Sequence, residues 1–120
     1  MENMTIGEQA PPIEAKPVVI ISLEQKEVKK GDNFIGDKLI LKCRHVDVGD
    51  IEIGKIRFMK GKNVTDSGLW VSKDKEGKLP YNCAVSYLMR HLKVENVMDM
   101  KDKQIETILD DNGYLIAKGY

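Results

Sequence analysis

The sequence predicts a mainly β fold (α+β) with five or six strands and one helix between the third and fourth main strands. Short runs rich in β-branched residues recur between turn residues, as they do in small β domains. Asn112-Gly113 separates the last two runs, and Asn-Gly is the strongest short-range signal for a β-hairpin. Residues 83–92 place apolar side chains at helical spacing.

The length indicates a single domain. A chain of 120 residues can bury one real core. Residues 1–16 hold Gly7, Pro11 and Pro12 and show no periodicity, so we expect a flexible N-terminal tail followed by one domain over residues 17–120.

The N-terminus and the hydropathy pattern predict a cytoplasmic protein. The first residues lack a basic region followed by an apolar stretch, so they do not read as a signal peptide. The longest apolar run, residues 18–21, is too short to cross a bilayer, and no membrane association is expected.

The net charge is zero, which argues against a protein that coats nucleic acid indiscriminately. The charges are nevertheless uneven. Residues 38–93 hold 12 Lys or Arg against 6 Asp or Glu, and the rest of the chain holds 7 against 13. This distribution is compatible with a localised basic face whose binding would be weak and sensitive to salt.

The order of elements follows from runs and turns along the chain. We expect a first strand over residues 18–23, extended by alternation through residue 28, and then a loop over residues 31–37. Two strands, residues 38–44 and 51–59, should follow, with a turn between them, and a short strand around Trp70 should come next.

Gly54 divides the second of these two strands. Side chains alternate between the faces of a strand. Ile51 and Ile53 set one phase, whereas Ile56 and Phe58 set the opposite one. A glycine where the phase reverses predicts a bulge or a sharp bend.

The same sorting predicts a basic outer face. Two neighbouring strands would present four cations on it: Lys42, Arg44, Lys55 and Arg57. If Leu69 and Val71 point inward, Trp70 lies on the outer face, and cations beside an exposed aromatic ring suit a single-stranded nucleic acid. Lysines on loops would extend the face, so the predicted binding residues are Lys42, Arg44, Lys55, Arg57, Lys60, Lys62, Trp70 and Lys73. The competing interpretation is a solvated sheet face with Trp70 in the core.

The C-terminal half holds the helix and a hairpin. We expect the helix at about Cys83 to Leu92, with Asn82 as its N-cap. Residues 104–109 and 114–118 should form the closing hairpin around the Asn-Gly turn.

This order resembles that of the oligonucleotide/oligosaccharide-binding (OB) barrel. The late region, with Ser86-Tyr-Leu-Met, Leu92-Lys-Val94 and Gly113-Tyr-Leu115, is also similar to small single-stranded-DNA-binding proteins of phages and archaea. The resemblance implies an OB-like β-barrel over residues 17–120. It also implies a binding face on the second and third strands.

No pattern of catalytic or metal-binding residues stands out. Cys43 and His45 would share a strand face, but structural zinc usually comes from Cys-x2-Cys-type or His-x3-His-type pairs, which neither Cys43/His45 nor Cys83/His91 forms. No positioned base or oxyanion loop accompanies the thiols. Asp110 and Asp111 lie in a predicted turn, where aspartate serves the backbone. We therefore expect no enzyme activity, no cofactor and no metal.

The sequence thus favours non-catalytic binding of single-stranded DNA or RNA. The alternative is a protein-interaction or accessory module without a nucleic-acid role, in which a strand edge or the helix docks a protein partner or a second copy as a homodimer. A further hypothesis concerns the acidic residues of the predicted tail. Glu2, Glu8 and Glu14 would rest on the basic face and compete with the ligand.

Overall fold

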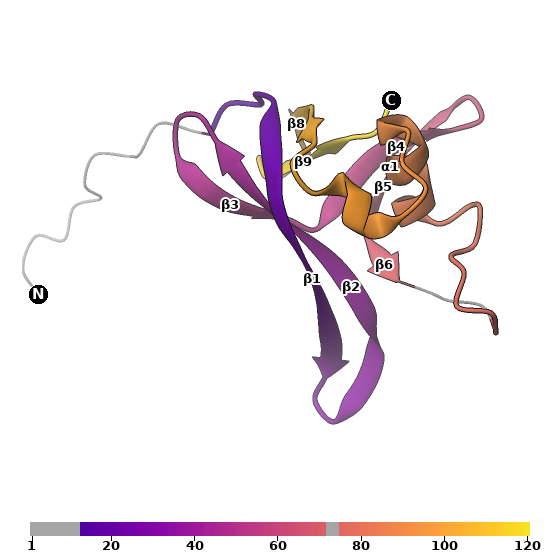
Figure 1. Cartoon of the computed structure of the whole chain (residues 1–120). Helices are drawn as coiled ribbons and strands as arrows, with labels where there is room; N and C mark the ends of the chain where they lie inside the picture. Colours follow the sequence, from indigo (N-terminus) through magenta and orange to yellow (C-terminus); the bar gives the residue numbers. More distant parts are fainter. Residues whose placement is uncertain (1–12, 72–74) are drawn as a thin grey trace, which may run out of the picture.

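The computed structural model describes residues 13–71 and 75–120. This part of the chain is mostly β, with one α-helix, and its largely antiparallel sheet curls into a half-barrel (Figure 1). The strands are β1 (Val18–Lys30), β2 (Asn33–His45), β3 (Gly49–Ile53), β4 (Lys55–Lys60), β5 (Asn63–Gly68), β6 (Trp70–Val71), β7 (Gln104–Ile105), β8 (Thr107–Leu109) and β9 (Leu115–Lys118). The helices are α1 (Ala84–Leu92) and the short 3₁₀ helix η1 (Val97–Met100).

The strands pair in two groups. One sheet has the order β3-β2-β1-β7, and β6 also pairs with β2. The other has the order β5-β4-β9-β8. All pairs are antiparallel except β4 with β9, which is parallel. The expectation that the strand with Lys42 and the strand with Arg57 are neighbours is therefore wrong, because β2 and β4 belong to different sheets.

Single residues carry the chain from one sheet to the other. Gly54 lies between β3 and β4, and Glu106 lies between β7 and β8. Ile53 and Ile56 are both buried although three positions separate them, so the pleat reverses at Gly54. The predicted phase reversal is confirmed, and it keeps apolar side chains on the core side of both sheets.

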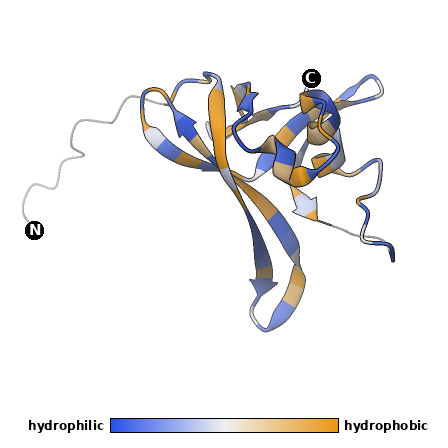
Figure 2. Ribbon diagram, in the orientation of Figure 1, coloured by the Kyte–Doolittle hydropathy of each residue, from blue (hydrophilic) through white to orange (hydrophobic). Residues whose placement is uncertain are grey.

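The β1–β2 hairpin extends well beyond the core (Figure 1). The predicted loop over residues 31–37 is wrong for most of its length, because the ladder continues to a pair between Lys30 and Asn33. Only a two-residue turn remains, and Gly31 has the positive φ of 63° that such a turn requires. Hydrophilic and hydrophobic bands alternate along this arm (Figure 2).

Helix α1 begins one residue later than predicted. Cys83, not Asn82, is its N-cap, with an extended backbone and a thiol sulfur that accepts the Ser86 N–H at 3.4 Å. The Ser86 hydroxyl donates to the Pro80 carbonyl at 2.7 Å, which fixes the approach to the helix. Since sulfur is a weaker acceptor than an amide oxygen, the residue type at position 82 favoured the wrong start.

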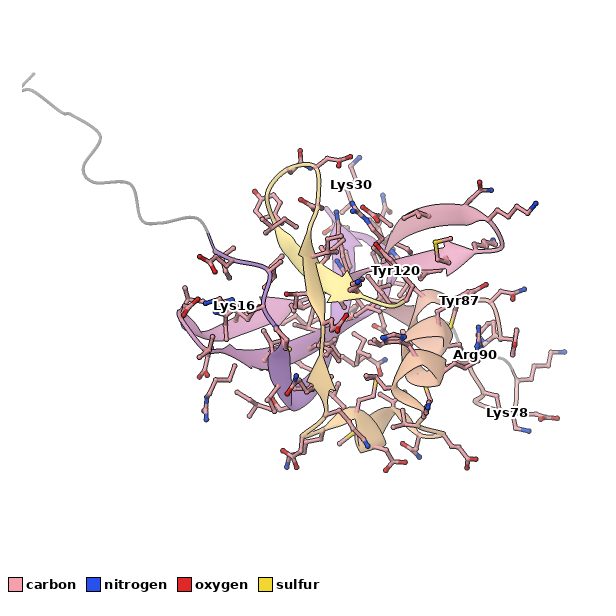
Figure 3. All side chains as sticks on the ribbon, turned by 90° about the horizontal axis from the view of Figure 1, so that it is seen from above. Lys16, Lys30, Lys78, Tyr87, Arg90 and Tyr120 are labelled. Atoms are coloured by element: carbon pink, nitrogen blue, oxygen red, sulfur yellow. The ribbon has the colours of Figure 1, made fainter. Side chains whose placement is uncertain are left out.

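Aromatic contacts hold the helix against β4. The rings of Tyr87 and Phe58 stack with their centroids 4.4 Å apart. Arg90 projects from the same side of the helix as Tyr87 (Figure 3), and its guanidinium carbon lies 4.6 Å from that ring's centroid. These contacts add to the apolar burial that fixes α1 on the sheet.

The core lies between the curled sheet and the helix. Its fully buried large side chains include Ile20, Leu41, Ile53, Ile56, Leu69, Leu88 and Met100. Burial raises the pKa of the Cys43 thiol to about 12, so this thiol stays protonated at neutral pH. Within residues 13–71 and 75–120, no helix has the length and apolar character needed to cross a membrane.

The contact between Gly119 and β4 gives a test of this packing. A Cβ added at Gly119 would lie 2.6 Å from Ile56 Cδ1 and 3.2 Å from the Arg57 carbonyl oxygen. We expect Gly119→Ala to lower the free energy of unfolding by about 1–3 kcal/mol, the usual range for overpacking, in a urea titration. Ile56→Val removes the obstructing Cδ1. The double variant should therefore lose less stability than the sum of the two single variants, and strict additivity would contradict this packing.

Candidate nucleic-acid interface

Leu69 determines where Trp70 points. The Leu69 side chain is fully buried, and its backbone joins two parts of the fold. Its N–H donates to the Gly54 carbonyl at 3.0 Å, and its carbonyl accepts the Leu39 N–H at 2.7 Å. Because side chains alternate along a strand, an inward Leu69 directs Trp70 outward. The predicted outer position of the indole is confirmed, and Trp70 is 39% exposed.

Two glycines lie against the indole of Trp70. A Cβ at Gly36 would meet Trp70 Cε3 at 3.5 Å, an ordinary contact. A Cβ at Gly68 would meet Trp70 Nε1 at only 2.9 Å. The indole thus lies against the chain at Gly36 and Gly68, and 39% of Trp70 remains exposed. An exposed aromatic surface of this kind can stack on a planar group.

Lys38 lies between the indole and the bend at Gly54. It pairs with Trp70 in the β2–β6 ladder, and its Nζ is 5.8 Å from the ring centroid. Its Cε would be 3.1 Å from a Cβ at Gly54, so a side chain there would require Lys38 to shift by a few tenths of an ångström. Burial, and then the charge of Lys55, hold the pKa of Lys38 below its usual value.

Lys38 and Lys55 form a pair of like charges without a counterion. Among the described residues, neither forms an ion pair. Lys55 helps to lower the pKa of Asp66, but that carboxylate is held by Arg57. An anion close to both ammonium groups would lower their mutual repulsion.

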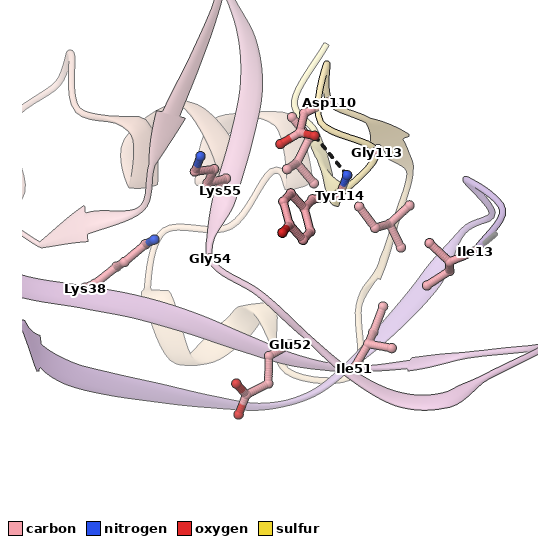
Figure 4. Close-up of a pocket in the computed structure, with 11 residues that line it drawn as sticks. Ile13, Lys38, Ile51, Glu52, Gly54, Lys55, Asp110, Gly113 and Tyr114 are labelled. Carbon is pink, nitrogen blue, oxygen red and sulfur yellow. Dashed lines mark hydrogen bonds between the residues drawn. The ribbon is translucent and has the colours of Figure 1, made fainter. Parts of the chain in front are cut away.

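The hollow itself has a volume of about 500 Å³ and lies between the Gly54 bend and the β8–β9 turn. Lys38 and Lys55 reach it from one side, and the ring of Tyr114 stands on the other (Figure 4). The Tyr114 side chain is 71% exposed. Glu52 and Asp110 also line the hollow, so its cationic character is confined to the two lysines.

The β8–β9 turn holds Tyr114 in place through Asp110. The Asp110 carboxylate accepts the backbone N–H groups of Asn112 and Tyr114, each at 2.9 Å. Gly113 has the φ of 83° that the turn needs. This carboxylate therefore serves the backbone, as the sequence predicts for an aspartate in a hairpin turn.

The cations predicted on β2 are neutralised by neighbouring carboxylates. Lys42 Nζ lies 3.0 Å from Glu24 Oε2, and this contact raises the pKa of Lys42. Arg44 Nε lies 3.4 Å from Asp50 Oδ1. Both side chains point outward as predicted, but each has a counterion on an adjacent strand.

The remaining predicted cations are spread along β4 and its turn. Arg57 binds both carboxylate oxygens of Asp66, at 2.6 and 2.9 Å, and its hydrogen bond to Asp66 raises its pKa. Lys60 and Lys62 are exposed beside the β4–β5 turn. Lys73 lies outside the described residues. Among the predicted residues that the structure describes, Lys55 and Trp70 both lie beside Lys38.

The sequence prediction omitted Lys38 and Tyr114. Lys38 is separated from Lys42 and Arg44 by an even number of residues, so strand alternation predicts that it points outward with them. It was omitted because it stood next to a predicted loop. Tyr114 follows the Asn-Gly turn, and no local pattern indicates that this turn faces Gly54.

His45 has a structural role. It is buried, its Nδ1 accepts the Asp47 N–H at 3.0 Å, and its Nε2 therefore carries the proton donated to the Glu14 carbonyl at 2.7 Å. Both ring nitrogens are thus engaged. Among the described residues, no group of three or more His, Cys, Asp or Glu side chains could hold a metal ion.

The contacts of Gly36 and Gly68 with the indole give a test of its position. Gly68→Ala should displace Trp70, because the new methyl group would lie 2.9 Å from its Nε1. We expect stronger quenching of the fluorescence of this sole tryptophan by acrylamide. Gly36→Ala is the matched control, since its Cβ makes only an ordinary contact of 3.5 Å with the same ring. Equal quenching of the two variants would contradict the geometry.

The repulsion between Lys38 and Lys55 can be tested by measuring the stability of variants. The folded chain binds the Lys38 proton more weakly than the unfolded chain does, because the pKa is lowered on folding. Lys38→Met should therefore raise stability at neutral pH, by less than about 1 kcal/mol since a half-exposed charge is screened. This gain should shrink as the pH rises toward the usual lysine pKa of about 10.4. Lys42→Met, which breaks an ion pair, should give no gain, and a gain equal to that of Lys38→Met would count against the proposed repulsion.

Comparisons with protein-family models, with curated proteins and with solved structures give no match for this chain. The arguments for function therefore come from the contacts of Trp70, Lys38, Lys55 and Tyr114 themselves. These residues combine aromatic surface, unpaired positive charge and a hollow of about 500 Å³ on one side of the molecule.

Proposed function

We propose that this protein binds single-stranded nucleic acid, without catalysis, on the surface formed by Trp70, Lys38, Lys55 and Tyr114. The observation that carries the proposal is the half-exposed indole beside two lysines that have no ion-pair partner among the described residues. Bases stack on aromatic rings regardless of sequence, and phosphates neutralise cations, so the two features together suit an unpaired strand.

Each part of the surface takes a different part of the ligand. Trp70 stacks a base, because the indole lies against Gly36 and Gly68 and keeps 39% of its surface exposed. Lys38 and Lys55 contact a phosphate at the hollow, where an anion relieves their mutual repulsion. Tyr114 provides a second ring for a neighbouring base. The more distant exposed cations Lys60 and Lys62 add weaker attraction for a longer strand.

We also propose that the half-barrel is an OB-like barrel. Three facts support this reading. Counting β3 with β4 and β7 with β8 as single interrupted strands, and leaving out β5 and the two-residue β6, gives five strands, with α1 between the third and the fourth. The pairs β1–β2, β2–β3, β4–β9, β9–β8 and β7–β1 then form one circuit. Ligands of such barrels lie across the second and third strands, between the loops that border them, which is the region of Lys38, Gly54 and Tyr114.

The charge distribution predicts how strongly the ligand binds. The cations Lys42, Arg44 and Arg57 already have carboxylate partners, so a phosphate would have to compete for them. Few counterions are then released on binding, and the affinity is modest with a shallow dependence on salt. This agrees with the zero net charge of the chain.

Titration with oligo-dT tests the proposal. We expect the oligonucleotide to quench Trp70 fluorescence, less so as salt rises. In an anisotropy assay with labelled oligo-dT, Trp70→Ala should cost about 1–3 kcal/mol, or roughly 5- to 150-fold in affinity. Lys38→Gln/Lys55→Gln should weaken binding and reduce the salt slope by about 0.7 per lost phosphate contact.

The matched control is Lys42→Gln/Arg44→Gln, which removes the same charge from the ion-paired region. It should change the affinity much less than the Lys38/Lys55 variant does. An equal loss of affinity would indicate that the binding face lies on β2, as the sequence predicted. No quenching of Trp70 at low salt would contradict nucleic-acid binding altogether.

The alternative function is a protein-interaction module, and a second hollow favours it. A groove of about 860 Å³ runs beside α1 and is lined by apolar side chains that include Leu79, Val85, Met89 and Val97. Such a groove can take an apolar segment of a partner. This alternative predicts that oligo-dT leaves Trp70 fluorescence unchanged at every salt concentration.

A further inference from the structure

We propose that two copies of this chain form a dimer by exchanging their β1–β2 arms, so that the tip of each arm lies in the groove beside α1 of the other copy. The arm tip is the end of the hairpin, residues 29–35. The groove is the hollow of about 860 Å³ lined by α1, η1 and the base of the arm. This surface is different from the one around Trp70, so the inference does not depend on nucleic-acid binding.

The arm tip exposes apolar side chains that the core does not use. Phe34 is 61% exposed and Ile35 is 54% exposed. The arm projects from the body of the molecule, and the β1–β2 ladder continues to its end (Figure 1). Two adjacent large apolar side chains on a projecting hairpin gain free energy when another chain covers them.

The groove offers apolar surface that matches the tip. Met98 lines it and is 62% exposed, and a flexible thioether side chain adapts well to an aromatic ring. Lys78 also lines the groove, but its Nζ lies 3.5 Å from Glu76 Oε2. The other apolar side chains of the lining include Leu39, Val71, Leu79, Val85, Met89 and Val97.

Charged side chains at the two places complement each other. Arg90 and Glu95 line the groove, and Lys30 and Asp32 are exposed at the arm tip. Within the described part of the chain, none of these four forms an ion pair. With the tip of one copy in the groove of the other, Asp32 can pair with Arg90 and Lys30 with Glu95. Each charge of one place then has an opposite charge at the other.

Contacts within the chain hold Arg90 in place for a carboxylate. Its Nη1 donates to the Tyr81 carbonyl at 2.7 Å. Its guanidinium carbon lies 3.8 Å from the centroid of the Tyr81 ring and 4.6 Å from that of the Tyr87 ring. A guanidinium fixed against two rings loses little freedom on binding a carboxylate, and its other N–H groups are free to donate.

The position of the groove makes the exchange reciprocal. Gln25 and Leu39, which pair at the base of the arm, also line the groove. From this pair the ladder runs to Lys30 and Asn33, which is about 17 Å at roughly 3.3 Å per residue. When two arms lie antiparallel about a twofold axis, each tip therefore reaches the base of the other arm. Every contact then occurs twice, and the assembly closes as a dimer.

The middle of each arm, near that axis, carries two carboxylates that approach their own copies. Glu27 Oε1 lies 3.4 Å from Lys29 Nζ, and Asp37 Oδ2 accepts the side-chain amide of Gln25 at 2.8 Å. These partners within the arm reduce the repulsion. The part that remains weakens the dimer, so we expect it to form only at high concentration.

Sedimentation velocity over a concentration series tests the exchange in the full chain. We expect the natural chain to change from monomer to dimer as its concentration rises to about 1 mM, a range that detects weak association. Phe34→Ser/Ile35→Ser should raise the dissociation constant at least about a hundredfold, because two apolar side chains lose their cover in both contacts. The matched control Val46→Ser/Val48→Ser removes exposed apolar side chains beyond the other end of β2 and should leave the dimer unchanged.

A charge exchange identifies the contact itself. Asp32→Arg and Arg90→Glu should each weaken the dimer by roughly tenfold or more, because each brings like charges together. The double variant Asp32→Arg/Arg90→Glu restores opposite charges and should recover most of the affinity. Lys30→Glu and Glu95→Lys, singly and together, give the same test without altering the contacts of Arg90 with the two tyrosines.

Two results would overturn the inference. One is a natural chain that stays monomeric at about 1 mM. The other is a dimer that the arm-tip variant and the single charge variants leave intact, since it would use another surface. No nucleic acid is present in these measurements, so neither result bears on the binding proposed for Trp70.

Discussion

The reversal of the strand pleat at Gly54 is the constraint on which the rest of the structure depends. The chain buries Ile53 in one sheet and Ile56 in the next, and the extra residue between the strands is Gly54, where a Cβ would lie 3.1 Å from Ile40 Cδ1 and from Lys38 Cε. The carbonyl of Gly54 then accepts the N–H of Leu69 at 3.0 Å, which brings the short strand β6 beside β2. The same bend therefore joins the two sheets and sets the position of Trp70.

Charge pairing decides which cations are available to a ligand. The outer face of β1, β2 and β3 alternates in sign, and its lysine and arginine side chains are matched by Glu24, Glu52 and Asp50. Such exposed pairs contribute little to stability, but they lower the positive potential that would attract a polyanion. Lys38 and Lys55 differ because they are close to each other and form no ion pair within the described chain. A like-charge pair opposes folding, and the proposed binding would account for its position beside a partly exposed indole.

The proposed function depends on both charged and aromatic groups. A phosphate and a carboxylate are both anions, so lysines alone would not distinguish a nucleic acid from an acidic peptide. In the proposed function, the preference for nucleic acid would come from the rings of Trp70 and Tyr114, which a peptide carboxylate does not use.

The local pattern of the sequence determined much of the fold: the buried strand residues, the phase reversal at Gly54, the outward Trp70, the helix and the Asn-Gly hairpin. These features depend on side-chain alternation and backbone preference between near neighbours, which a sequence displays directly. Only the tertiary structure decided that β2 and β4 lie in different sheets, that carboxylates neutralise Lys42, Arg44 and Arg57, and that Tyr114 faces Lys55 across a hollow. The physical reason is that charge pairing and cavities depend on which distant strands become neighbours. The spacing of residues along the chain does not specify these neighbours.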